Sequence, residues 1–206
     1  MSDRKSGIKT LMMSVIMSSP GPLIVGLGLL VGQSSTQAAD FIRRSIELLA
    51  IILSFVVYII TTKDGGVDKI KKQRYEKGTT LFVGSAMVIS GAIMIILALT
   101  SSSEEKGNVL PGLAIAVMGV IANSIFWIRY KKLGNQTQNK ILLTQSNLYR
   151  AKTFVDGSVV IALGTVLLSS NPTVSFYFDL VGTLCVSIYL IVVGVKSLVN
   201  ELHQPA

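Results

Sequence analysis

The chain has 206 residues, of which half are apolar and only 15% are charged. A mean hydropathy of +0.60 and so few charges exclude an ordinary soluble domain, in which about a quarter of the residues are charged. One cysteine and one histidine exclude a disulfide framework and a zinc cluster of the usual Cys/His spacing. Aromatic residues make up only 7% of the chain, too few for a base-stacking surface, so we expect no nucleic-acid partner despite the net charge of +8.

Six apolar stretches follow one another along the chain. They cover about residues 8–31, 38–60, 79–99, 109–128, 149–168 and 174–195. Each is near the roughly 20 residues that a helix needs to cross about 30 Å of hydrocarbon. Lipid offers the backbone no hydrogen-bond partner, so these stretches predict helices. The predicted fold class is an all-α membrane protein with six transmembrane helices. We expect a single transmembrane domain over residues 1–206, without a cytosolic C-terminal domain.

The first apolar stretch follows basic residues and could be taken for a secretory signal. It is longer than the roughly 7–15 apolar residues of a signal core, so we expect a membrane helix that is retained. Pro20 and Pro22 lie inside it and lack backbone donors, which predicts a kink or a break. That irregularity is either a tolerated kink or a hinge.

Basic residues alternate between the connections of the apolar stretches. They gather in the leading tail, in residues 61–78 and from Arg129 onward, whereas the other connections carry only Lys106. The positive-inside rule therefore places both termini in the cytoplasm. Most of the positive charge then reflects topology and contact with anionic lipid headgroups. We expect a multi-pass protein of the plasma (inner) membrane, and we expect residues 135–147 to be a helical cytosolic extension of the fifth helix.

Ionisable residues inside the apolar stretches are the most informative feature of the sequence, because such residues are costly in lipid and usually face the bundle interior. They are Asp40, Arg43, Arg44 and Glu47 in the second stretch, Lys152 and Asp156 in the fifth, and Asp179 in the sixth. At 100° per residue, the four in the second stretch cover about 100° of the helix and form one polar face.

Two interpretations of these residues remain open. Pairs four residues apart can neutralise each other and pin the bundle together. These pairs are Arg43 with Glu47, Asp40 with Arg44, and Lys152 with Asp156. Alternatively, the carboxylates of Glu47 and Asp156 form a central cation or proton site, beside a lysine that can release its proton when it is desolvated.

The two charged segments, residues 39–47 and 148–156, carry a resemblance to a known family. Together with the stretch Arg74–Gly78, with Asp179 before Leu180-Val181-Gly182, and more weakly with Asn123, they make the chain similar to the cation diffusion facilitator family of metal/proton antiporters. The resemblance implies six helices with both ends cytosolic and a homodimer. It also implies that a divalent cation such as zinc, manganese or iron is transported against protons, with no resident cofactor.

The resemblance places Arg43 and Glu47 at the metal-ligand positions of the second helix, and Lys152 and Asp156 at those of the fifth. Two of these four positions are basic. Arg43 stays protonated and cannot ligate a metal, and Lys152 can do so only when deprotonated. A tetrahedral zinc site therefore does not carry over intact. Glu47 and Asp156 remain the candidate metal ligands, with Asp40, Arg44 and Asp179 as supporting polar residues.

Two functions from different classes fit these features. One is a cation transporter with an atypical site between the second and fifth helices. The other is a non-transporting structural or regulatory relative whose site is locked by internal ion pairs. An enzyme is not expected, because no His-Glu-x-x-His motif, nucleophile–base pair or phosphate-binding glycine loop is present. His203 is expected to be solvated and Cys185 to lie in the core.

Overall fold

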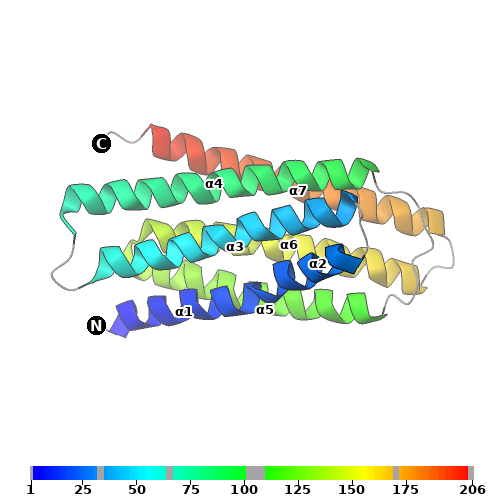
Figure 1. The fold of residues 1–206 in the computed structure, drawn as a ribbon, viewed down its shortest axis with the longest axis horizontal. Coiled ribbons are helices and arrows are strands. Elements are labelled where there is room, and N and C mark those ends of the chain that lie inside the picture. The colour runs from blue at the N-terminus through cyan, green and yellow to red at the C-terminus, as the bar shows by residue number, and fades with distance from the viewer. Residues whose placement is uncertain (1, 32–34, 64–66, 101–109, 169–171, 204–206) are drawn as a thin grey trace.

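The computed structural model describes residues 2–31, 35–63, 67–100, 110–168 and 172–203. Nearly all of these residues are helical, and no strand occurs among them. The helices are α1 (Ser2–Ser18), α2 (Pro20–Val31), α3 (Ser35–Thr62), α4 (Lys69–Thr100), α5 (Leu110–Thr137), α6 (Lys140–Leu168) and α7 (Pro172–Leu202). They run roughly along one common axis (Figure 1). The predicted all-α fold class is confirmed.

The helices correspond to the six predicted stretches, because α1 and α2 are two halves of the first one. Five described segments are long and apolar enough to cross a membrane. They are Asp3–Leu27, Phe41–Thr62, Lys69–Thr100, Leu113–Thr137 and Leu180–Leu202. The remaining long helix, α6, carries three charged residues in its middle, Arg150, Lys152 and Asp156.

The predicted irregularity of the first stretch is a break at Ser19. The amide of Ser19 still donates to the carbonyl of Val15 at 3.0 Å, and Pro20 then begins α2. Pro20 and Pro22 lie in the first turn of α2, where a missing backbone donor removes no intrahelical bond. The prolines therefore start a new helix instead of bending a continuous one.

Residues 135–147 differ from the expected single extension of the fifth helix. The first of them complete α5, and Gln138 forms the turn with a positive φ of 49°. The side-chain oxygen of Asn139 then accepts from the amide of Leu142 at 3.2 Å and caps α6, which starts at Lys140. The expectation was wrong about the turn because no proline or glycine marks it, and asparagine and glutamine can supply it instead.

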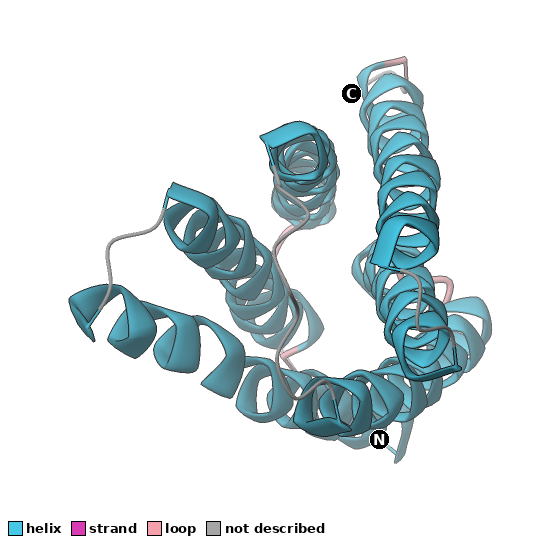
Figure 2. Ribbon diagram, turned by 90° about the vertical axis from the view of Figure 1, so that its right-hand side faces the viewer, coloured by secondary structure: helices cyan, strands magenta, loops and turns pink. Residues whose placement is uncertain are grey.

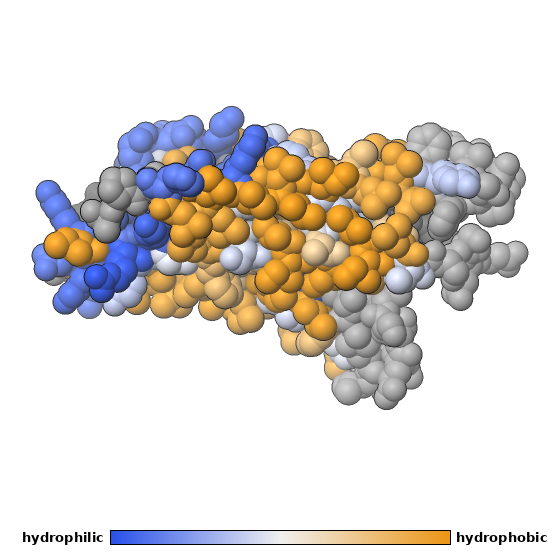
Figure 3. Space-filling model, turned by 90° about the horizontal axis from the view of Figure 1, so that it is seen from above, coloured by the Kyte–Doolittle hydropathy of each residue, from blue (hydrophilic) through white to orange (hydrophobic). Residues whose placement is uncertain are grey.

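Polar and apolar surfaces separate along the long axis of the molecule. The two termini lie at the same end of the bundle (Figure 1). Hydrophilic side chains gather at that end, and hydrophobic side chains cover the middle of the face seen in Figure 3. This distribution suits a protein that crosses a bilayer. Figure 2 looks along the bundle from the opposite end.

Helix packing follows the positions of small residues and of buried aromatic rings. α4 packs along α7, where a Cβ on Gly194 would lie 2.7 Å from the carbonyl oxygen of Gly84. Only glycine permits so close a backbone approach. α5 packs along α6, with Tyr130 and Tyr149 fully buried between them and their ring centroids 5.4 Å apart.

Of the two predictions for the lone histidine and the lone cysteine, one is confirmed and one is wrong. His203 is exposed, as expected, and its Nδ1 lies 2.9 Å from the carbonyl oxygen of Val199. Cys185 is exposed on α7, so the expectation of a core position is wrong. An apolar side chain on a membrane helix is about equally stable against lipid and in the protein core. The apolar sequence around Cys185 therefore does not show which of the two Cys185 faces.

Candidate functional site

Glu47 lies in the middle of α3 and is only 5% exposed. Arg43, one turn earlier on the same helix, donates from Nη1 to Glu47 Oε1 at 3.1 Å. The predicted pair four residues apart is therefore present. A buried carboxylate needs such a partner, because the loss of its water shell is otherwise uncompensated.

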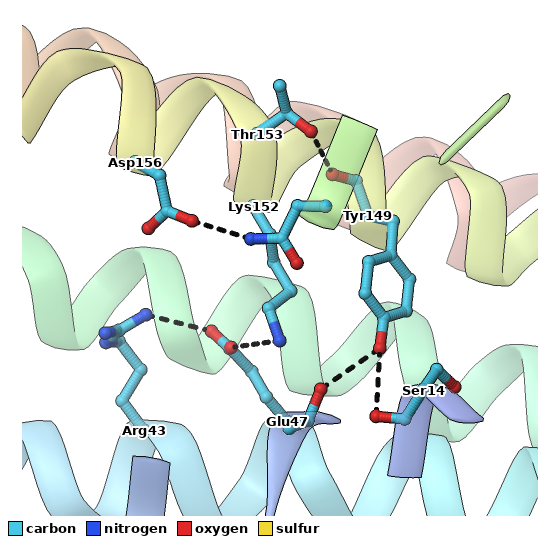
Figure 4. A network of polar contacts seen from close by, with 9 residues as sticks. Ser14, Arg43, Glu47, Tyr149, Lys152, Thr153 and Asp156 are labelled. Atoms are coloured by element: carbon cyan, nitrogen blue, oxygen red, sulfur yellow. Dashed lines mark hydrogen bonds and ion pairs between the residues drawn. The ribbon is translucent and has the colours of Figure 1, made fainter. Parts of the chain in front are cut away.

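Lys152 reaches from α6 across to α3. Its Nζ lies 3.8 Å from Glu47 Oε2, so the two oxygens of this carboxylate face two different cations (Figure 4). The ammonium also lies 5.1 Å from the centroid of the Tyr149 ring, in a cation–π contact. The ion-pair contact of Lys152 is therefore with Glu47, whereas the predicted pairing with Asp156 is present only as an electrostatic attraction over a longer distance.

Asp156 is held from α5 instead. The side-chain amide of Asn123 donates to Asp156 Oδ2 at 2.6 Å. Gly119, one turn away from Asn123, makes room for the carboxylate, since a Cβ there would collide with Oδ2. Asn123 and Gly119 lie on the same face of α5 because they are four residues apart, and together they form a seat for the Asp156 side chain.

Tyr149 connects this network to the first helix. Its hydroxyl lies 3.1 Å from Ser18 Oγ and donates to the carbonyl of Ser14 at 3.4 Å. Ser14 Oγ in turn lies 2.6 Å from the hydroxyl of the buried Tyr130. The ring that contacts the Lys152 ammonium is therefore held by α1 (Figure 4). Ser18, one of its partners, directly precedes the break at Ser19.

Of the supporting residues predicted from the sequence, Arg44 is the one whose side chain is described. It is exposed, and its guanidinium lies beside Gly21 of α2. Arg43 and Glu47 are buried by contrast, and the Arg44 charge also attracts the Asp156 carboxylate. Asp40 lies in α3 and Asp179 in α7, and their side chains are outside the described part of the structure. The predicted pairing of Asp40 with Arg44 therefore also lies outside the described residues.

The central network holds two carboxylates and two cations, Arg43, Glu47, Lys152 and Asp156. Their formal charges sum to zero, which lowers the cost of keeping them inside the bundle. Among the residues that the structure describes, no group of three or more His, Cys, Asp or Glu side chains could hold a metal ion. A cation could thus meet Glu47 or Asp156, but the side chains that the structure describes do not build a closed metal site of four ligands.

Two parts of the network were not found from the sequence. Tyr149 precedes Lys152 by three residues and so shares its helix face, a signal that could have been used. Gly119 makes room for the Asp156 carboxylate. Its spacing of four residues from Asn123 is the corresponding signal.

These features define a helical membrane protein with a buried network of ionisable side chains. The family model for the cation efflux transmembrane domain matches residues 11–204. The chain belongs to the cation efflux family, and the resemblance drawn from its charged segments is confirmed. No curated protein matches the sequence.

Proposed function

We propose that the chain is a cation transporter whose ion passes between α3 and α6 and meets the carboxylates of Glu47 and Asp156. Membership of the cation efflux family supports a transporter. The observation that carries the proposed site is the position of Lys152, whose ammonium comes from one helix and faces a carboxylate of the other at 3.8 Å. A fixed positive charge stands where a mobile cation would bind.

Displacement of Lys152 is the physical step that transport requires. The 3.8 Å contact is longer than a hydrogen bond, whereas the Arg43 contact of 3.1 Å is not. Lysine can lose its proton when it is desolvated, whereas arginine stays charged. A cation that takes the place of the Lys152 charge, while a proton leaves, would keep the network neutral. This exchange is the form of cation/proton antiport that we propose.

The same charge balance bears on the identity of the ion. The family resemblance implies a divalent cation such as zinc, manganese or iron. Because only one of the two built-in cations can lose its charge, a divalent ion would leave one excess positive charge in the network. Both monovalent and divalent cations therefore belong in a transport assay. We further propose a homodimer in the plasma membrane with both termini cytoplasmic.

A second candidate function is favoured by the two cationic side chains that contact Glu47. If Arg43 and Lys152 hold this carboxylate permanently, the site is locked, and the protein is a structural or regulatory relative that moves no ion.

The test is a flux screen of the purified protein in proteoliposomes, with cation-sensitive and pH-sensitive dyes inside. We expect cation flux coupled to proton movement, abolished by Glu47→Gln and by Asp156→Asn and retained in Asp68→Asn, which removes an exposed carboxylate at the start of α4. Flux that survives both central substitutions would contradict the proposed site. An unsubstituted protein that is folded yet silent with every cation would instead support the locked relative.

A further inference from the structure

A recess of about 400 Å³ lies on the surface of α5, near the end of the bundle that holds both termini. It is lined by Trp127, Ile128, Lys131, Lys132 and Asn135. At 100° per residue these five side chains lie within about 140° of the helix circumference, so they form one continuous face. None of them belongs to the central network.

The chemistry of the recess changes along the helix axis. Its inner end is formed by the Trp127 ring and the Ile128 side chain, and its outer end by two amines and an amide. The distance from Trp127 to Asn135 is about 12 Å by helical rise. A bilayer changes from acyl chains to headgroups over a similar depth, and tryptophan is enriched at that boundary. The recess therefore matches an amphiphile better than a soluble ligand.

The two lysines of the recess are available to a ligand. In the described part of the chain, neither Lys131 nor Lys132 forms an ion pair or a hydrogen bond through its side chain, and both are exposed. Lys140, at the start of the next helix, differs, because its Nζ lies 3.2 Å from a carboxylate oxygen of Glu201. Two adjacent ammonium groups repel each other, and an anion between them relieves that repulsion.

An apolar track continues from the recess toward the middle of the bundle. Ile128 is 63% exposed and Ile125 51%, and Ile121 extends the same side of α5 two turns from Ile128. The Trp127 backbone is joined to α6, since Ser146 Oγ donates to its carbonyl at 3.4 Å. An acyl chain can lie along this track while its headgroup meets the lysines.

We propose that this recess binds an anionic glycerophospholipid. The lipid phosphate lies between Lys131 and Lys132, Asn135 hydrogen-bonds to the headgroup, and one acyl chain runs past Trp127 and Ile128. This inference does not depend on the proposed transport function, because it uses none of the residues of the central network.

Trp127 is the only tryptophan of the chain, so its fluorescence reports on this recess without any substitution. The protein is reconstituted in vesicles that contain a fixed fraction of lipid with brominated acyl chains, which quench tryptophan on contact. In one series the brominated lipid is phosphatidylglycerol, and in the other it is phosphatidylcholine. We expect stronger quenching by the anionic lipid, with a preference of about fivefold for each lysine.

Variants identify the origin of the preference. Lys131→Gln with Lys132→Gln should abolish it, whereas Lys69→Gln with Lys71→Gln, which removes the same charge from exposed positions at the same end, should keep it. Equal quenching of the unsubstituted protein by the two lipids, or a preference that survives Lys131→Gln with Lys132→Gln, would overturn the proposal. Millimolar inorganic phosphate should leave the preference intact. Its complete loss would show that the recess takes small anions in place of a lipid.

Discussion

Lys152 on α6 makes its ion-pair contact with Glu47 on α3, and not with Asp156 one turn along its own helix. This arrangement gives one carboxylate two cations and gives the other carboxylate an amide partner. The two acids of the network are therefore unequal. Glu47 has two cations at ion-pair distance. Asp156 instead accepts the hydrogen bond from Asn123 and fills the space that Gly119 leaves, while the charges of Lys152 and Arg44 attract it from further away.

The two cations on Glu47 should differ in their contribution to stability. Arg43→Gln should lower the free energy of unfolding by about 3–5 kcal/mol, because it removes the closer partner of a buried charge. Lys152→Gln should lower it by only about 1 kcal/mol, since its contact is beyond hydrogen-bond distance and Arg43 remains. Denaturant unfolding in detergent measures both. Equal losses would show that the 3.1 Å and 3.8 Å contacts do not rank the partners.

The seat of Asp156 should tolerate no added methyl group. Gly119→Ala should destabilise the protein by about 1–3 kcal/mol, because the new Cβ would displace the carboxylate or shift α5. Gly157→Ala is the matched control, since a Cβ at that helical glycine meets nothing within 4 Å. Thermal unfolding of the two variants compares them. Identical behaviour would contradict the role assigned to Gly119.

Replacement of both cations by histidine should convert the network into a metal site. Arg43→His with Lys152→His would place two imidazoles beside Glu47 and Asp156, a ligand set that Zn²⁺ accepts. We expect calorimetry to detect a gain in Zn²⁺ affinity over the unsubstituted protein. Arg129→His with Lys196→His, at exposed positions, controls for histidine introduced elsewhere. No gain would count against the equivalence of Arg43 and Lys152 to metal-ligand positions.

The hydroxyl contact between Ser14 and Tyr130, at 2.6 Å, should couple α1 to α5. In a double-mutant cycle, Ser14→Ala and Tyr130→Phe should show a coupling of about 1 kcal/mol in the free energy of unfolding. Ser14→Ala combined with Thr100→Val, at the far end of α4, should be additive. Additivity in the first pair would mean that the contact contributes no stability.

The sequence predicts the features that depend on residue spacing within a single helix. The six apolar stretches, the irregularity at Pro20 and the pairing of Arg43 with Glu47 all follow from spacing along a single segment. The same rule pairs Lys152 with Asp156, but the ion-pair contact of Lys152 is with Glu47, because a contact between helices depends on how the helices pack. The exposure of Cys185 could not be predicted either, since lipid and protein interior are both apolar.

The break at Ser19 divides one membrane crossing into two helices. α1 contacts both sides of the central network, because it hydrogen-bonds to the tyrosines of α5 and α6 through Ser14 and Ser18 and also packs along α3. α2 packs along α3. α1 therefore lies against both of the helices that the Lys152–Glu47 contact joins, and any sliding of α3 against the α5–α6 pair must break contacts of α1, next to the residue at which the chain already interrupts this crossing.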